Sequence, residues 1–289
     1  MRNFGASLPP PVRSSMPAAP YGDDDASVSP APRDGDADSA ALVVPGTDTD
    51  AAVSCLRAHG VTVLQACIPP EVVQATACAL QPFLDHIAEH WSVDDALTLP
   101  SWRAWGVTRT PRVNAGKKNV HFIPDAVLPD GKPSLHAALE ALAQAGGFAA
   151  VLRAYHGHDV VLYETGVSVT RAGGSGMELH ADGGEGEATV LLALRDVPRE
   201  VGALALVPGT HVAYTNHGAC VDGEDGDADV QHKQRPEVTW HCYAPGDAVV
   251  LDARTLHGAS DDVSPRESTG SKAGIARAVC WFIYQLEVE

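Results

Sequence analysis

The sequence predicts a mainly β fold with helices at its N-terminal side, an α+β chain in which a β-domain fills the C-terminal half. Apolar residues recur at helical spacing in stretches before residue 156, whereas short β-rich runs dominate from residue 158. Gly, Pro, Asp and Asn separate these runs. Several strands at such spacing are typical of an all-β sandwich or barrel, so we expect the helices to pack on such a domain.

Residues 1–45 are expected to be disordered, and residues 46–289 are expected to form one domain. The first segment holds eight of the 21 prolines, together with small and acidic residues and almost no aromatic ones. A segment of this composition buries too little apolar surface to offset the entropy that it would lose on ordering.

The helices are predicted from capping residues and from apolar spacing. Asp48 or Thr49 can cap a short helix that ends at Gly60, and the β-rich run VTVLQA follows it. A long amphipathic helix is expected over residues 69–91, where two prolines precede apolar residues at helical spacing. A second helical region is expected over residues 133–155.

An acidic insert interrupts the predicted strands. Residues 221–237, VDGEDGDADVQHKQRPE, break the β pattern and are expected to form a solvated loop, with a lid over a site as the alternative. The β-rich runs on its two sides cover residues 159–171, 187–197, 202–211, 237–244, 246–253 and 276–288.

The chain is acidic, with a formal net charge of −17 over 289 residues. This charge argues against nucleic acid and anionic membrane surfaces as partners, and it suits a protein with a small substrate. Neither a membrane-spanning run nor the apolar core of a secretory signal is found, so a cytoplasmic location is expected, with an organelle transit peptide as the alternative. The six cysteines form no CxxC pair and are expected to be free thiols. No pattern predicts an oligomeric state.

One short stretch, GMELHADGG at residues 176–184, places His180 and Asp182 two residues apart among glycines. Roughly one such pair is expected by chance in a chain with 13 histidines, and a surface turn capped by Asp182 would explain it. Alternation along a strand would let both side chains point to the same side. His257 lies much further along, at the end of another predicted strand, and Arg277 opens the last strand. Two histidines and one carboxylate can occupy one face of an octahedral iron(II) and leave three positions open.

Over residues 47–289 the chain resembles the phytanoyl-CoA dioxygenase (PhyH) family of iron(II)- and 2-oxoglutarate-dependent oxygenases. LRAHGVTVLQACIPPEVV resembles the opening helix, strand and helix of the family, and LHADGG resembles its His-x-Asp segment. VGALALVPGTH resembles a strand and turn that end in Pro-Gly-Ser/Thr-His, and LDARTLHGAS resembles the distal-histidine segment. The resemblance implies a double-stranded β-helix, the cupin-like jelly roll, flanked by helices.

The resemblance also implies roles for particular residues. His180, Asp182 and His257 would be the iron ligands. Arg277 would pair with the distal carboxylate of 2-oxoglutarate, which an arginine can hold with two parallel hydrogen bonds. The gap of twenty residues between His257 and Arg277 is longer than is usual in the family, so Arg266 is a competitor. Arg277 is favoured because it lies in a β-rich run, whereas Arg266 lies in a polar loop next to a proline.

Other polar residues near these segments have more than one interpretation. Thr170 and Arg171 lie on the strand that leads to His180 and could contact the cosubstrate, with a purely structural role as the alternative. His211, in the PGTH turn, is favoured as a structural residue over a fourth metal ligand. Three more histidines flank or lie within the acidic insert and are expected at the surface: His217, His232 and His241.

A basic segment, TRTPRVNAGKKNVHF at residues 108–122, lies between the predicted helices and the β-domain. One hypothesis is that it binds an acidic group of the substrate. The alternative is a solvated loop that balances the acidic surface. Its basic residues are Arg109, Arg112, Lys117 and Lys118.

The implied activity is oxidation of a small-molecule substrate, most simply its hydroxylation, coupled to conversion of 2-oxoglutarate and O2 into succinate and CO2. Iron(II) would be the metal, and ascorbate is expected to support the reaction. Halogenating relatives replace the ligand carboxylate, so the presence of Asp182 favours hydroxylation or a related oxidation. Two alternatives are a non-catalytic jelly-roll binding protein with a vestigial metal site and a cupin-type metalloenzyme that does not use 2-oxoglutarate.

Overall fold

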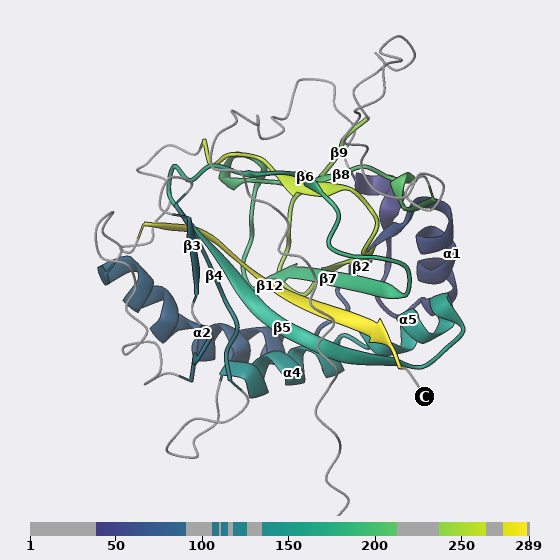
Figure 1. The fold of residues 1–289 in the computed structure, drawn as a ribbon, viewed down its shortest axis with the longest axis horizontal. Coiled ribbons are helices and arrows are strands. Elements are labelled where there is room, and N and C mark those ends of the chain that lie inside the picture. Colours follow the sequence, from purple (N-terminus) through teal and green to yellow (C-terminus); the bar gives the residue numbers. More distant parts are fainter. Residues whose placement is uncertain are drawn as a thin grey trace, which may run out of the picture.

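The structure, a computed structural model, has two β-sheets that lie face to face, with helices covering the outer face of the larger sheet (Figure 1). In the described part of the chain the larger sheet has eight strands and the smaller has four. This arrangement confirms the predicted mainly β domain with helices packed on it. The described residues are 39–90, 106–109, 111–114, 118–125, 135–212, 237–263 and 274–287.

The large sheet has the order β1-β2-β10-β7-β12-β5-β4-β3, and all of its pairings except β1 with β2 are antiparallel. The small sheet, β6-β11-β8-β9, is antiparallel throughout. From β5 to β12 the strands mostly alternate between the two sheets, so the chain crosses repeatedly from one sheet to the other. The strands are β1 (Val43–Pro45), β2 (Val61–Gln65), β3 (Arg112–Asn114), β4 (Asn119–Phe122), β5 (Val160–Arg171), β6 (Met177–His180), β7 (Glu187–Ala193), β8 (Leu204–Leu206), β9 (Thr239–His241), β10 (Ala248–Asp252), β11 (His257–Ala259) and β12 (Ile275–Leu286).

Strand β10 shows that the large sheet is buried on both faces. Ala248 and Val250 pack in the core beneath the helices, whereas Val249 and Leu251 pack between the two sheets. A strand buried on both faces needs apolar residues at consecutive positions, which explains the uninterrupted run in the sequence. Each residue on the inner face therefore points into the space between the sheets.

Helix α1 (Thr49–His59) begins and ends where the sequence predicts. The Asp48 side chain accepts a hydrogen bond from the N–H of Ala51 at 2.9 Å, which caps the first turn. At the other end Gly60 has a φ of +71°, and its N–H donates to the Leu56 carbonyl at 2.7 Å. These caps fix the point at which the chain enters β2.

Helices α2 (Pro70–His90), α4 (Leu135–Ala145) and α5 (Phe148–His156) confirm the two predicted helical regions. The second region contains two helices, because Gly147 has a φ of +65° and separates them. The apolar faces of all three helices pack in the core on the outer side of the large sheet (Figure 1).

Ordered structure begins within the segment that was expected to be disordered. Residues 39–45 form the 3-10 helix η1 (Ser39–Leu42) and strand β1, which pairs in parallel with β2. Ser39 Oγ lies 2.9 Å from Nδ1 of His241, so this short piece is attached to the small sheet as well. Residues 1–38 lie outside the described residues.

His241 is buried, which corrects the prediction that it lies at the surface. It belongs to β9 of the small sheet, beneath η1, and only 4% of it is exposed. Burial lowers the pKa of its imidazole to about 4. The side chain is therefore neutral at physiological pH. The acidic insert is described only at Glu237, and His217 and His232 lie outside the described residues.

The buried His241 is expected to make the protein less stable as the pH falls below 6.5. Its pKa is 6.5 in the unfolded chain and about 4 in the fold, so the unfolded state takes up a proton first and stability is lost between these values. The loss of unfolding free energy between pH 7 and pH 4.5 should be smaller in His241→Asn by about 2 kcal/mol. Urea titrations followed by circular dichroism at both pH values check this, and an equal loss in both proteins would contradict it.

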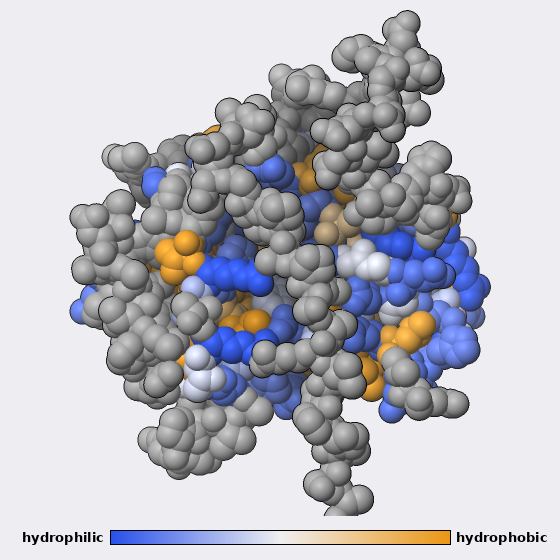
Figure 2. Space-filling model, in the orientation of Figure 1, coloured by the Kyte–Doolittle hydropathy of each residue, from blue (hydrophilic) through white to orange (hydrophobic). Residues whose placement is uncertain are grey.

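One face of the molecule shows where the described polar and apolar residues lie (Figure 2). On the face shown in Figure 2 hydrophilic residues dominate, and the hydrophobic areas are small and separate. Within the described residues no single helix is long and apolar enough to cross a membrane, whereas α4 and α5, bent by 58°, meet that criterion as a pair. Among the described residues, the large apolar side chains that are exposed are Val113, Val161, Tyr163, Val212 and Val263.

Candidate active site

Two histidines meet where two strands of the small sheet pair. His180 is the last residue of β6, His257 is the first residue of β11, and the two are direct neighbours across the antiparallel pair. Residues opposite each other in such a pair project to the same face of the sheet, and the two ring centroids lie 4.5 Å apart. The sequence predicted that His257 ends a strand, but it begins one, after a turn that follows β10.

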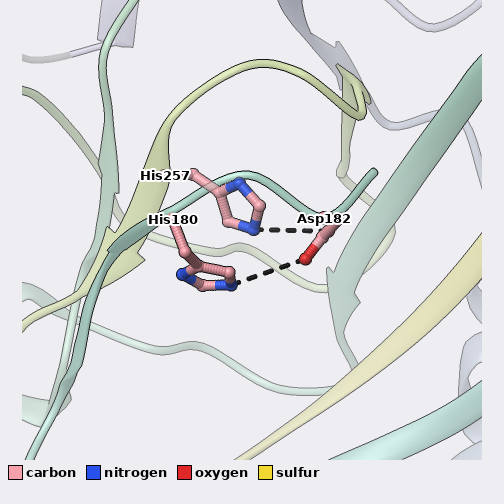
Figure 3. A group of neighbouring side chains, drawn as sticks. All are labelled: His180, Asp182 and His257. Carbon is pink, nitrogen blue, oxygen red and sulfur yellow. Dashed lines mark ion pairs between the residues drawn. The ribbon is translucent and has the colours of Figure 1, made fainter. Parts of the chain in front are cut away.

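Asp182 follows the end of β6 and points back toward both histidines (Figure 3). Its backbone N–H donates to the Ala253 carbonyl at 2.9 Å, which holds the chain in this position. Asp182 Oδ1 is 3.4 Å from His180 Nε2, and Oδ2 is 3.4 Å from His257 Nε2. The sequence predicted that His180 and Asp182 lie on one strand, but the strand ends at His180. Asp182 lies in the segment that follows, and this segment still brings the two side chains together.

Backbone carbonyls set the tautomer of both histidines. His180 Nδ1 is 2.8 Å from the Glu178 carbonyl, and His257 Nδ1 is 3.0 Å from the Thr255 carbonyl. A carbonyl oxygen only accepts hydrogen bonds, so each Nδ1 carries the proton and each Nε2 keeps its lone pair. Both lone pairs are thus available on the side that faces Asp182.

The three groups shift one another's pKa values. Burial raises the pKa of Asp182, but the neighbouring His257 and His180 outweigh it and hold this pKa well below its ordinary range. Burial lowers the pKa of His257, and Asp182 offsets only part of that effect. For His180, burial lowers the pKa, but Asp182 and Glu178 together raise it above its ordinary value. At neutral pH the carboxylate is ionised, as a ligand of a divalent cation must be.

These side chains fit a divalent first-row metal ion. One donor atom from each of His180, Asp182 and His257 lies within 4.8 Å of the other two, and the described residues contain no other such group. Bonds of about 2.1 Å, as imidazole makes to zinc, put adjacent ligand atoms of an octahedron about 3 Å apart, close to the separations seen here. Two imidazoles and one carboxylate on one face are the ligand set of non-haem iron(II) oxygenases.

Arg277 projects into the space between the two sheets. The next residue on β12, Ala278, packs beneath the helices, so the side chain of Arg277 points to the opposite face. Only 7% of Arg277 is exposed. Its Nε donates to Thr170 Oγ1 at 3.2 Å, and its NH1 donates to the Gly202 carbonyl at 2.6 Å.

The buried guanidinium of Arg277 has no carboxylate within ion-pair distance among the described residues. Burial lowers its pKa, although Tyr243 and two aspartates raise it in part. Thr170 and Gly202 use two of its five N–H groups, and the others keep the planar geometry that fits a carboxylate. An unpaired buried charge is costly, so an anion that reached this position would be strongly favoured.

Thr170 lies directly opposite Arg277 in the pairing of β5 with β12. Its hydroxyl accepts from Arg277 Nε, so it orients the guanidinium. A contact between Thr170 and the cosubstrate itself stays a prediction. Arg171 ends the same strand, and Arg266, the competing anchor, lies outside the described residues.

His211 does not join the site, in agreement with its expected structural role. It is buried, and a side chain at Gly60 would collide with its ring. It is not part of the group of converging donor atoms. The close contact between Gly60 and the His211 ring therefore packs the end of α1 against the PGTH turn.

The basic segment forms a hairpin, β3 with β4, at the edge of the large sheet. The sequence did not predict this hairpin. Arg109 NH1 makes an ion pair with Glu164 Oε2 at 2.6 Å, and Lys118 Nζ donates to the Gly173 carbonyl at 3.1 Å. Both cations thus have partners within the chain, and Lys117 lies outside the described residues.

His121 is a residue near the site that the sequence had not singled out. Its neighbours on β4 pack beneath the helices, so its side chain projects to the same side as Arg277. His121 Nδ1 is 2.6 Å from Ser168 Oγ. Burial, followed by charges that include Arg277 and His180, lowers the pKa of His121 to about 4, so its imidazole is neutral. The alternation within NVHF was the signal that could have identified it.

Solved structures with the same fold have low sequence identity to this chain. The α-ketoglutarate-dependent epimerase SnoN from nogalamycin biosynthesis has 18% identity and a TM-score of 0.54, with 82% of each chain covered. HygX from Streptomyces hygroscopicus has 12% identity and a TM-score of 0.51, covering 81% of this chain and 86% of that one. EctD from S. alaskensis has 14% identity and a TM-score of 0.50, covering 90% and 80%. These likenesses confirm the predicted jelly-roll fold.

A jelly roll that brings two histidines and one carboxylate together has the ligand set that non-haem iron(II) oxygenases use. The family model of phytanoyl-CoA dioxygenase (PhyH) matches residues 56–268. The chain belongs to this family, and it is an iron(II)- and 2-oxoglutarate-dependent oxygenase. No curated protein sequence matches the chain at a significant level.

Proposed function

We propose that the chain hydroxylates a small organic molecule, with His180, Asp182 and His257 as the iron ligands and Arg277 as the anchor of 2-oxoglutarate. One observation supports this most: three donor atoms converge within 4.8 Å in the same fold that buries an arginine without a carboxylate partner among the described residues. A metal site alone would suit many jelly-roll proteins, and the arginine adds a place for a dicarboxylate. The proposed domain comprises residues 46–289 together with η1 and β1.

The residues of the chain hold and orient the reactants. When bound, iron(II) supplies the activation of O2 that is coupled to oxidation of 2-oxoglutarate to succinate and CO2. His180 Nε2, His257 Nε2 and the Asp182 carboxylate would hold one face of the ion, and the Nδ1 hydrogen bonds keep both rings in place. Arg277 would hold the far carboxylate, and the arginine itself is buried.

The substrate is proposed to be a small molecule, and the fold neighbours support that class. SnoN has been solved with Fe3+, α-ketoglutarate and nogalamycin RO, and HygX with nickel, 2-oxoglutarate and hygromycin B. The finer proposal of an acidic group on the substrate now depends on Arg112, which lies opposite His121 at the edge of the inner face. Arg109 and Lys118 support it less, because both have partners in the chain.

Hydroxylation is proposed over halogenation because Asp182 fills the ligand position that a halide would need. The alternative of a vestigial binding protein would be favoured by a broken set of ligands, and here all three side chains converge. A cupin-type enzyme that does not use 2-oxoglutarate would not explain why Arg277 is buried without a carboxylate partner among the described residues.

The proposed function is tested by incubating the full chain, purified without oxygen, with iron(II), ascorbate, 2-oxoglutarate and a set of small-molecule substrates. Admission of O2 should give metal-dependent succinate, and the substrate that is turned over should gain the mass of one oxygen atom. If no 2-oxoglutarate binds to the metal-loaded protein and no succinate forms with any substrate, the proposed function is wrong.

Gly202 is expected to be essential for the cosubstrate anchor. It has a φ of +107°, and a Cβ there would collide with NH1 of Arg277 and lie 3.1 Å from the Ser260 carbonyl. Gly202→Ala should therefore displace the guanidinium and weaken 2-oxoglutarate binding by about ten-fold, equivalent to about 1.4 kcal/mol. Calorimetric titration of the nickel-loaded protein measures this.

Gly157→Ala is the matched control for the Gly202 variant. Gly157 also has a positive φ, +75°, but a Cβ there meets no atom within 4 Å. The control places a side chain at a positive φ without a collision, and it should bind 2-oxoglutarate normally. Equal weakening in both variants would show that strain, and not the displaced guanidinium, causes the effect.

A further inference from the structure

One tight turn contacts both Asp182 and His257. The turn comprises residues 252–255, beginning at the end of β10 and ending two residues before β11, and the Thr255 N–H closes it by donating to the Asp252 carbonyl at 2.8 Å. The Ala253 carbonyl accepts from the N–H of Asp182 at 2.9 Å and from the N–H of Gly183 at 3.1 Å. The orientation of this one carbonyl therefore sets the position of the ligand carboxylate.

The same turn holds the second metal ligand. The Thr255 carbonyl is 3.0 Å from His257 Nδ1, so it fixes the tautomer and the rotation of that ring. The Thr255 hydroxyl donates to the Gly60 carbonyl at 2.8 Å, which ties the turn to the end of α1. Two of the three proposed iron ligands thus take their positions from two carbonyls that lie two residues apart.

A buried ionic cluster holds this turn in shape. The Asp252 carboxylate accepts from Arg254 Nε at 2.8 Å, from Arg254 NH2 at 2.8 Å and from the Arg254 backbone N–H at 3.0 Å. A fourth hydrogen bond comes from the hydroxyl of Tyr155, on α5, at 2.7 Å. The Asp252 side chain is fully buried, and 13% of the Arg254 side chain is exposed.

The Asp252 carboxylate uses its full hydrogen-bonding capacity in this cluster. The carboxylate has about four lone-pair sites, and the four hydrogen bonds fill them. The guanidinium bridges both oxygens in a planar fork, which lysine could not reproduce. Because Arg254 and Asp252 flank Ala253, the fork locks the two peptide groups between them, including the carbonyl that holds Asp182.

We propose that Asp252, Arg254 and Tyr155 position the metal ligands: the cluster fixes the turn whose carbonyls hold Asp182 and His257. None of the three touches the metal site itself, so they are positioning residues. The proposal rests on the proposed function, since it assigns the ligands in the same way.

The test uses the full chain and cobalt(II) as the probe, titrated without oxygen and followed by visible absorption. Asp252→Asn and Arg254→Lys should each raise the dissociation constant for cobalt by about 10- to 100-fold, the range found for residues that orient metal ligands. Tyr155→Phe removes one hydrogen bond and should have a smaller effect. The absorption bands of the bound cobalt should shift in the same order, because the ligand geometry loosens.

Asp159→Asn is the matched control. It breaks another aspartate–arginine pair, Asp159 with Arg153 at 2.9 Å, at the surface beside the end of α5. Cobalt affinity should be unchanged in this variant. Circular dichroism at the titration temperature shows whether each variant is folded, so that a loss of stability is separated from a loss of metal affinity.

The outcomes separate this inference from the function on which it rests. If the unsubstituted protein binds cobalt and the folded Arg254→Lys and Tyr155→Phe proteins bind it equally well with unchanged bands, the cluster is only structural and the inference is wrong. If the unsubstituted protein binds no cobalt, the proposed metal site fails, and the inference fails with it. Asp252→Asn is not needed for either decision, so its misfolding would leave the test intact.

Discussion

His257→Ala is expected to abolish metal-dependent turnover and to weaken metal binding by more than about 100-fold, because residues that merely orient a ligand already cost about 10- to 100-fold. Under the proposed function His257 supplies a ligand atom itself. Its Nε2 lies 3.4 Å from Asp182 Oδ2, and only 5% of the residue is exposed, so little solvent is at hand to replace the imidazole. Titration of the oxygen-free protein with cobalt(II) measures the affinity.

His241→Asn is the matched control for this experiment. His241 is as buried as His257 and also lies in the small sheet, but it is not part of the converging group of donors. It should bind cobalt as the unsubstituted protein does. Normal cobalt binding by a folded His257→Ala protein would instead remove His257 from the ligand set.

Arg277→Leu is expected to weaken 2-oxoglutarate binding by roughly 30-fold to several-thousand-fold. Removing one partner of a buried, hydrogen-bonded charge pair costs about 2–5 kcal/mol, and each 1.4 kcal/mol is ten-fold in affinity. The substitution also leaves the buried Gly202 carbonyl without its donor. Metal affinity should change little, because Arg277 is not among the converging ligands. Calorimetric titration of the nickel-loaded protein with 2-oxoglutarate separates the two effects.

Two further variants decide which arginine is the anchor. Arg277→Lys keeps the positive charge but loses the planar fork, so its affinity for 2-oxoglutarate should be intermediate. Arg266→Ala should bind the cosubstrate normally. If Arg266→Ala alone weakens binding, the assignment of Arg277 is wrong.

Local signals in the sequence predicted most of the fold. Asp48 and Gly60 mark the two ends of α1, and the apolar run of β10 is the pattern of a strand buried on both faces. The hairpin of β3 and β4 was not predicted, because its strands have only three and four residues and basic side chains obscure their alternation. The break at Gly147 has a local signal, two adjacent glycines, but glycine alone does not tell a break from a tolerated position.

The sequence predicts only some of the contacts on which the candidate site depends. The residue types and their order indicate the proposed metal ligands, but the register that sets His180 against His257 is a property of strand pairing. The cluster around Asp252 includes Tyr155, far away in the chain, so no local pattern could predict their hydrogen bond. His241 illustrates the opposite error: its place beside the acidic insert suggested exposure, whereas packing of the N-terminal piece buries it.

The position of Arg277 has a consequence for how related enzymes are recognised. Strand pairing places it opposite Thr170, and the long gap from His257 along the chain has no part in that contact. Insertions and deletions between the two residues can therefore accumulate without moving the guanidinium, as long as β12 keeps its register with β5. A search that counts residues between the two motifs would discard such members, whereas one that scores the pairing of the last strand would retain them.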